Sequence, residues 1–143
     1  MSNLTYAPIP EWAHIAKAIK NKQLSNEKLA ELWLLNNEKS YWLSRSAWSL
    51  YVIVKFRILI NPENQVKVWV PGYFCDESLV AIRSLPIKLY FYPILSNGKP
   101  DLTECNKMLG NCNPDIILFV HYFGEGLLSE ELYDIAQKND AWL

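Results

Sequence analysis

The stretch Ile116-Ile117-Leu118-Phe119-Val120 decides the fold, because five successive apolar residues leave no polar face for solvent. Such a run is typical of a strand that is buried on both faces in a parallel sheet. Asn113-Pro114 marks a turn directly before it. Further back, Val66–Val70 is rich in β-branched residues and predicts another strand, closed by Pro71-Gly72. Strands of this kind require helices on both faces of their sheet.

Strand and helix patterns alternate along the chain from residue 41 onward. We expect further strands at 41–43 and 87–92, and the beginning of one at 141–143. We expect helices from the turn at 44–47 to Ile60, and at 78–85, 101–108 and 130–138. Asp101 and Glu104 have capping-box spacing, and Ser129 can cap the last helix. The alternation predicts an α/β fold with right-handed crossovers and a mostly parallel sheet.

The first forty residues read as a separate region, an N-terminal arm followed by helices. Pro8 and Pro10 disfavour an early helix. Apolar residues then recur at helical spacing over 11–20, and Ser25 is a good N-cap for a second helix with an apolar stripe between Leu29 and Leu35. We therefore divide the chain into 1–40 and 41–143. Because Leu143 falls within an expected strand, we expect the natural product to continue past it.

Composition excludes several classes of protein. Half of the 143 residues are hydrophobic, which is enough for a packed core and excludes disorder. A net charge of -1 gives no broad basic surface for nucleic acid, and no apolar stretch is long enough to span a membrane. The three cysteines, without a secretory signal, favour reduced thiols in the cytoplasm. Their spacing predicts no metal site.

The first candidate site is Ser44-Arg45-Ser46-Ala47, at the start of the long helix. A helix N-terminus presents free N–H groups and a positive dipole, so it attracts anions. Arg45 adds a cation and Ser46 a hydroxyl donor. The alternative is that Ser44 or Ser46 simply caps the helix.

Two further candidates follow the carboxyl ends of expected strands, where ligands bind in open α/β sheets. The first is Pro71–Glu77, which follows Val66–Val70. Its Tyr73 and Phe74 could stack on a flat ring. The alternative is that both pack into the core and that Asp76 caps the next helix. After Ile116–Val120 comes His121, which either faces a site or is a satisfied, half-buried histidine. Glu125, between two glycines, reads as a solvated loop charge. The topology brings these strand ends together.

From about Leu43 to Leu143, the order of these segments resembles the DegT–StrS family of sugar aminotransferases. The family's phosphate-binding Ser-Gly-Thr-Ala corresponds to Ser44-Arg45-Ser46-Ala47, which implies that Ser46 and Ala47 bind the phosphate of pyridoxal 5′-phosphate. Arg45 replaces the family's glycine and can itself contact phosphate.

The family's next two motifs also have counterparts here. Its ring-stacking aromatic aligns with Cys75, so stacking passes to Phe74 or Tyr73. Its Val-His-x-x-Gly matches Val120–Gly124 and implies a cofactor-binding role for His121.

The resemblance implies the front part of a three-layer α/β/α large domain of the aspartate-aminotransferase fold group. The full enzyme would transfer an amino group, usually from glutamate, to a nucleotide-linked keto sugar in polysaccharide or cell-envelope sugar biosynthesis. It would act as a homodimer in the cytoplasm. The same family includes keto-sugar dehydratases.

The family's pyridine-binding Asp and Schiff-base Lys correspond to positions after Leu143, so we expect no catalytic residue in this chain. Without the later strands, Ile116–Val120 would have an open edge, and we expect the chain alone to be marginally stable or oligomeric. Two alternatives stay open: a non-catalytic remnant or binding module, and an unrelated α/β domain that binds phosphate.

Overall fold

The computed structural model describes residues 11–20, 28, 30–31, 34, 38–122 and 130–143. The chain divides into two units, residues 1–42 and 43–143. In the first unit, helix α1 (Trp12–Lys20) confirms the helix expected there, and none of its residues is buried. The second helix expected from Ser25 lies largely outside the described residues. No helix in the described part of the chain is long and apolar enough to cross a membrane.

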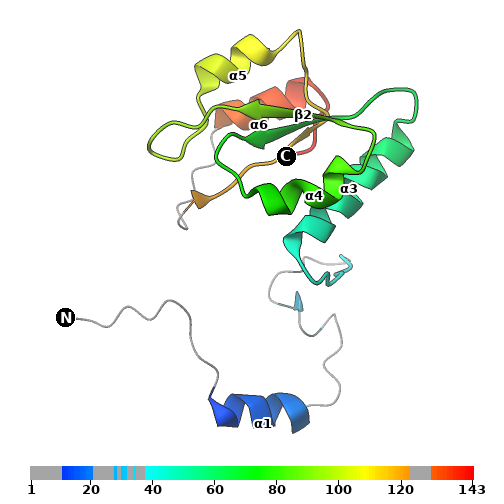
Figure 1. The fold of residues 1–143 in the computed structure, drawn as a ribbon, viewed down its shortest axis with the longest axis vertical. Coiled ribbons are helices and arrows are strands. Elements are labelled where there is room, and N and C mark those ends of the chain that lie inside the picture. The colour runs from blue at the N-terminus through cyan, green and yellow to red at the C-terminus, as the bar shows by residue number, and fades with distance from the viewer. Residues whose placement is uncertain (1–10, 21–27, 29, 32–33, 35–37, 123–129) are drawn as a thin grey trace, which may run out of the picture. The chain divides into compact units, whose positions relative to one another are not determined.

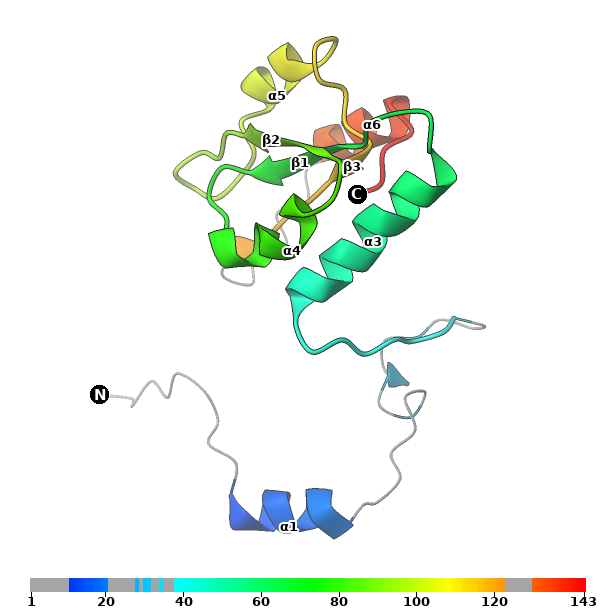
Figure 2. The ribbon, with the colours of Figure 1, turned by 45° about the vertical axis from the view of Figure 1, so that its right-hand side comes forward.

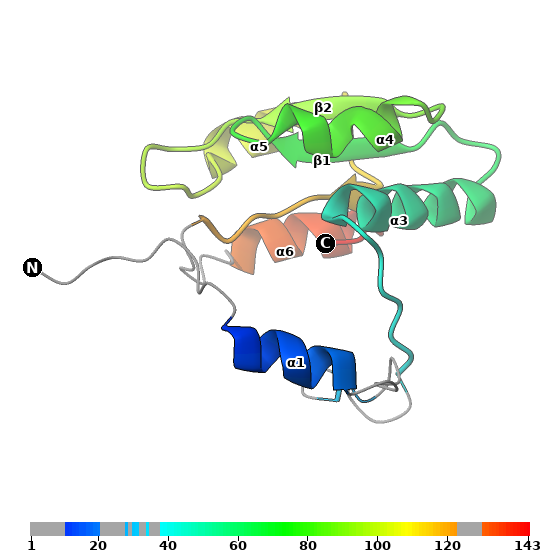
Figure 3. The same ribbon diagram turned by 60° about the horizontal axis from the view of Figure 1, so that its bottom comes forward.

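The second unit is a mixed α/β structure built on a parallel sheet, which confirms the expected fold class (Figure 1). Strand β1 (Lys67–Pro71) lies in the centre, between β2 (Lys88–Tyr92) and β3 (Ile116–Ile117). Both neighbours are parallel to it, with Trp69 opposite Tyr90 on one side and Ile117 on the other. Figure 3 shows β1 and β2 running side by side. Four of the five residues of β1 are buried, as expected for a strand covered on both faces.

Helices cover both faces of this sheet. On one face lie α3 (Ser46–Ile60), the 3-10 turn η1 (Asp76–Leu79) and α4 (Val80–Arg83), whose apolar residues pack on Val68 and Val70. On the other face lie α5 (Leu102–Met108) and α6 (Glu130–Lys138), which pack around Trp69. Figure 2 shows the two groups of helices on opposite sides of the strands. The alternation of side chains along β1 thus divides the core into two clusters.

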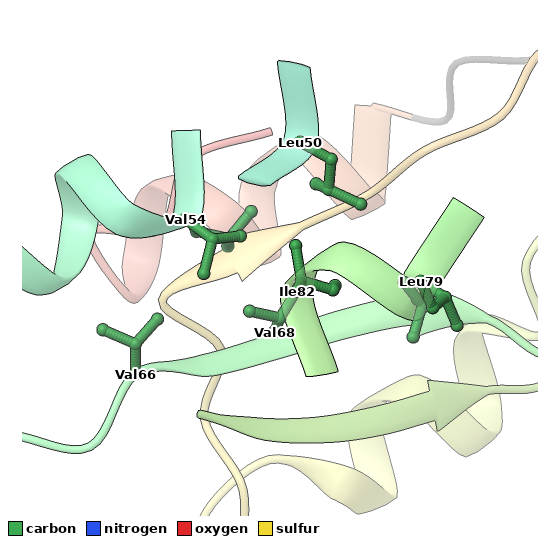
Figure 4. Packing of buried hydrophobic residues seen from close by; sticks show 8 residues of the cluster. Leu50, Val54, Val66, Val68, Leu79 and Ile82 are labelled. Atoms are coloured by element: carbon green, nitrogen blue, oxygen red, sulfur yellow. The ribbon is translucent and has the colours of Figure 1, made fainter. Parts of the chain in front are cut away.

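Helix α3 lies with its first turn toward the carboxyl end of β1. In Figure 4, Leu50 lies toward Leu79 of η1, whereas Val54 lies toward Val66, which precedes β1. Leu50, Val54 and Arg57 are the buried residues of this helix. Because α3 also contacts η1, its N-terminus is placed at the end of the sheet where ligands bind in α/β folds.

Arg57 is a charged residue on the buried side of α3. Its guanidinium donates to the Asp140 carbonyl at 2.7 Å and to the Asp140 carboxylate at 3.3 Å, and it lies 5.0 Å from the centre of the Trp142 ring. The Asp140 backbone has a φ of 52°, a left-handed conformation that Asp tolerates better than most residues. Arg57 therefore joins α3 to the segment that follows α6.

One expectation about strands is wrong, and another is confirmed only in part. Residues 41–43 form no strand, and their three exposed side chains bury neither face of one. The expected strand 116–120 is reduced to two ladder residues, although the Leu118 amide still donates to the Trp69 carbonyl at 2.8 Å. Its outer edge is not fully open, because Trp142 forms a parallel bridge with Ile116, with the Ile117 amide donating to the Trp142 carbonyl at 2.7 Å.

Candidate functional site

A pocket of about 390 Å³ lies at the carboxyl ends of β1 and β3. Its lining comes from the turn after β1 and the segment after β3: Tyr73, Phe74, Cys75, Val120 and Tyr122. The pocket is therefore where parallel α/β sheets place their ligands. Its volume lies at the lower end of the range for small-molecule sites, and its walls are largely aromatic.

The turn after β1 is held by its approach to β2. The Gly72 amide donates to the Tyr92 carbonyl at 2.7 Å. A Cβ at position 72 would lie 3.3 Å from that carbonyl oxygen, so a side chain there would crowd the contact. Glycine therefore allows the turn to lie close to β2, and this fixes the direction in which residues 73–75 leave the sheet.

Two tyrosines form one wall of the pocket. The ring centres of Tyr73 and Tyr122 are 5.5 Å apart with 43° between their planes. The Tyr122 hydroxyl donates to the Tyr73 carbonyl. Burial, and secondarily the proximity of Tyr73, raises the pKa of Tyr122 above its ordinary value. The phenol therefore stays protonated at neutral pH and keeps its role as a donor.

Within residues 71–77, neighbouring side chains differ in whether they pack into the core or face solvent. Phe74 is half-buried and packs against the cluster that contains Leu50, whereas Tyr73 is 69% exposed and Cys75 is also exposed. Of the two aromatic residues that could have packed into the core, only Phe74 does so. Asp76 does not cap a helix with its side chain. It begins η1 and forms an ion pair with Arg83, whose Nη1 lies 2.9 Å from the carboxylate.

The first turn of α3 has no side-chain cap. Arg45 is the N-cap residue in an extended conformation, and neither Ser44 nor Ser46 caps the helix, contrary to the simpler of the two sequence interpretations. The Trp48 amide bonds to the Arg45 carbonyl at 3.0 Å. The amides of Ser46 and Ala47 lie in the uncapped first turn, and both Arg45 and Ser46 are exposed. An anion would find donors and a cation here.

The structure brings only part of the expected site together. Phe74 and Cys75 line the pocket, whereas Arg45, Ser46, Ala47 and His121 do not. Arg45–Ala47 lie at the same end of the sheet, because α3 contacts η1. His121 is exposed, and its ring meets the Phe119 ring edge-on at 4.9 Å. The expected loop charge Glu125 lies outside the described residues.

Tyr122 belongs to the pocket although its residue type alone did not indicate a role. Its signal in the sequence is positional, since it follows a buried strand by two residues, just after the histidine that the motif singles out. Its partner Tyr73 comes from a segment 49 residues earlier. A contact between residues that far apart depends on the sheet register, which local pattern does not give.

A second hollow, of about 650 Å³, lies at the opposite, amino ends of the strands. It is lined mainly by amides and charged groups, among them Lys67, Lys88 and Asp115. Asp115 is engaged with the backbone, because its carboxylate accepts from the Lys67 amide at 2.7 Å. This hollow is open and hydrophilic, and it lies away from the strand ends that carry sites in α/β folds.

Metal ligands do not cluster in the described part of the chain, where no three His, Cys, Asp or Glu side chains come together around one point.

Comparison with models of known protein families, with curated proteins and with solved structures found no match to this chain.

Proposed function

We propose that this chain is the cofactor-binding front part of a pyridoxal-phosphate-dependent aminotransferase that acts on nucleotide-linked keto sugars. The observation that carries the proposal is the position of two features at one end of the sheet. One is the aromatic pocket after β1 and β3, and the other is the uncapped N-terminus of α3, a helix of 15 residues. The finer fold assignment, to the aspartate-aminotransferase group, is part of the same proposal.

The residues at the start of α3 suit a phosphate monoester. The free amides of Ser46 and Ala47 and the Ser46 hydroxyl would donate to phosphate oxygens, and Arg45 would neutralise part of their charge. The lack of a side-chain cap supports this role, because a cap would occupy the same donors. The arrangement thus fits the phosphate end of the cofactor.

The pocket suits the flat ring of the cofactor. Tyr73, Tyr122 and Phe74 offer aromatic surfaces, and Cys75 is small enough to leave one side open to the ring. His121, which is exposed next to Val120, would approach from the segment after β3. When bound, pyridoxal phosphate supplies the electron sink for amino transfer. The residues of this chain bind and orient it, and none of them transfers a proton.

The proposed function also implies substrates, an oligomeric state and a cellular location. We propose that the full-length enzyme is a cytoplasmic homodimer that takes a nucleotide sugar and an amino donor such as glutamate. The aromatic pocket and the cation of Arg45 at the start of α3 support binding of a phosphorylated ring compound, and they do not discriminate among sugars. The dehydratase chemistry of the same family would use the same cofactor site.

The test is binding of pyridoxamine 5′-phosphate, which is an amine and so cannot form a Schiff base with surface lysines. We expect saturable binding to the chain by calorimetry, at least tenfold weaker binding of phosphate-free pyridoxamine, and competition by inorganic phosphate only at much higher concentration. Ser46→Ala and Arg45→Ala should each weaken binding about three- to tenfold, because each removes a donor to the phosphate.

Matched controls keep this test specific. Ser84→Ala removes a hydroxyl just after α4, and Lys138→Ala removes an exposed cation at the end of α6, both away from the pocket lining. Both should leave binding unchanged. Equal affinity for pyridoxamine 5′-phosphate and inorganic phosphate would support the alternative of a phosphate-binding module, and no saturable binding of either would refute both functions.

A further inference from the structure

The hollow at the amino ends of the strands is not used by the proposed function. Its volume of about 650 Å³ lies within the range of small-molecule sites. Its twelve lining residues include six amide side chains, three lysines and two aspartates. They come from the turn after α3, the starts of β1 and β2, the turn before β3 and the end of α6. We call this site the amino-end hollow.

Two lysines of the amino-end hollow lie opposite each other on neighbouring strands. Lys67 begins β1 and Lys88 begins β2, and they are register partners, so their side chains leave the same face of the sheet. This is the face covered by α6, because Trp69 and Tyr90, two residues further along each strand, pack in the cluster on that side. Helix α6 ends at the third lysine, Lys138. Three ammonium groups therefore line one hollow, where they repel one another.

The two carboxylates of the amino-end hollow do not offset this charge. Asp140 is already paired with Arg57, at 3.3 Å, and the Asp115 carboxylate accepts from the Lys67 backbone amide at 2.7 Å. Within the part of the chain that the structure describes, none of the three lysines forms an ion pair. The hollow thus keeps an excess of positive charge, which a bound anion would neutralise.

Amide groups add hydrogen-bond donors to the same hollow. The Asn61 side-chain oxygen accepts from the Asn64 amide at 3.2 Å, and the Asn113 side-chain oxygen accepts from the Gly110 backbone amide. Because these oxygens are engaged, the NH₂ groups of Asn61 and Asn113 are left to donate. Among the described residues that line the hollow there is no aromatic side chain, so it does not suit a flat apolar ring. Ammonium and amide donors together suit the oxygens of phosphate groups.

We propose that the amino-end hollow binds a chain of phosphate groups, as found in a nucleoside triphosphate or in inorganic polyphosphate. A chain of phosphates can contact the opposed pair Lys67 and Lys88 and reach Lys138 at the same time, whereas a single phosphate group is too short to meet all three. The hollow lies at the other end of the sheet from the aromatic pocket, so this site is independent of the proposed function.

The test is calorimetric titration of the 143-residue chain with tripolyphosphate at low ionic strength. We expect saturable binding with a dissociation constant below about 1 mM, at least tenfold weaker binding of inorganic phosphate, and loss of affinity as salt is added. Adenosine triphosphate, which carries the same chain, identifies the source of the ligand. Tighter binding than that of tripolyphosphate would indicate a nucleotide, and equal or weaker binding would indicate inorganic polyphosphate.

Variants place the bound anion in the amino-end hollow. Lys67→Gln and Lys88→Gln should each raise the dissociation constant for tripolyphosphate at least threefold, because each removes one cation that contacts phosphate. Both should leave binding of pyridoxamine 5′-phosphate unchanged. Lys88→Gln should not lower the urea midpoint without ligand, since it removes one of two opposed like charges, and this guards against loss of folding.

The matched control is Lys99→Gln, which removes an exposed lysine in the turn after β2, outside the lining of the hollow. It should leave the dissociation constant for tripolyphosphate unchanged. Absence of saturable binding would overturn the proposal. Equal weakening by Lys99→Gln and Lys88→Gln would also overturn it, because the lysines of the hollow would then act only as solvated surface charges.

Discussion

The Tyr92 hydroxyl offers a test of how the candidate site is anchored to the sheet. Tyr92 is the last residue of β2 and is fully buried, and its hydroxyl donates to the Leu118 carbonyl at 2.8 Å. Leu118 lies just after β3, in the segment that continues to Val120 and Tyr122 of the pocket. Tyr92→Phe removes this one bond and leaves the volume of the ring in place.

The expected cost follows from the burial of the bond. A neutral hydrogen bond contributes about 0.5–1.5 kcal/mol net, and a buried acceptor left without a donor costs more. Leu118 is only half-buried, so water can partly replace the hydroxyl. We therefore expect a loss of about 1–1.5 kcal/mol in the free energy of unfolding, which lowers the urea midpoint by roughly 0.5–1 M.

The assay is urea unfolding followed by circular dichroism, with Tyr133→Phe as the matched control. Tyr133 lies on α6 with half of its surface exposed, so loss of its hydroxyl should change the free energy of unfolding by less than about 0.3 kcal/mol. If the two variants lower the midpoint equally, the hydroxyl of Tyr92 does not anchor the segment and the reasoning fails.

Three further predictions concern thiols, a helix cap and alkaline stability. Cys75 is exposed, whereas Cys105 and Cys112 are buried and burial raises the pKa of both, that of Cys105 to about 11. We therefore expect one thiol to react rapidly with a disulfide reagent in the native chain and all three to react after unfolding. Rapid reaction of all three thiols in the native chain would contradict this. Asp101 accepts from the Glu104 amide at 3.2 Å, so Asp101→Ala should cost about 1 kcal/mol in urea unfolding, and Asp134→Ala on the surface of α6 should cost much less. Burial raises the pKa of Tyr92 above its ordinary value of 10.0, so its contribution to stability is complete below about pH 10 and falls as the pH rises further. The urea midpoint should accordingly fall less steeply above pH 10 in Tyr92→Phe than in the unchanged chain, and equal slopes would argue against this account.

The elements with strong local patterns were predictable from the sequence. The apolar run at 66–70 gave the central strand, and the spacing of Asp101 and Glu104 gave the cap of α5 that the structure contains. The strand expected at 41–43 was wrong, because three apolar residues suggest a strand only where a sheet is available to pair with them. Pairing is a tertiary property that local pattern does not contain.

The candidate site was predictable in position and less so in detail. The rule that ligands lie beyond the carboxyl ends of parallel strands indicated residues 73–75 and the segment after β3, and the pocket lies there. The contact between Tyr73 and Tyr122 depends on how two loops meet, so residue types alone could not give it. The bare N-terminus of α3 was one of two interpretations that the local pattern left open, since serines beside a helix start usually cap it.

The bond between Arg57 and Asp140 also has a consequence for the chain during synthesis. The two residues are 83 positions apart. At the usual rate of translation of about 5–20 residues per second, Arg57 leaves the ribosome roughly 4–17 s before its partner. Throughout that interval α3 carries an unpaired charge on the side that must pack against the sheet. Packing α3 against the sheet before the residues after α6 emerge would bury the Arg57 guanidinium without this partner, which is costly for a charged group.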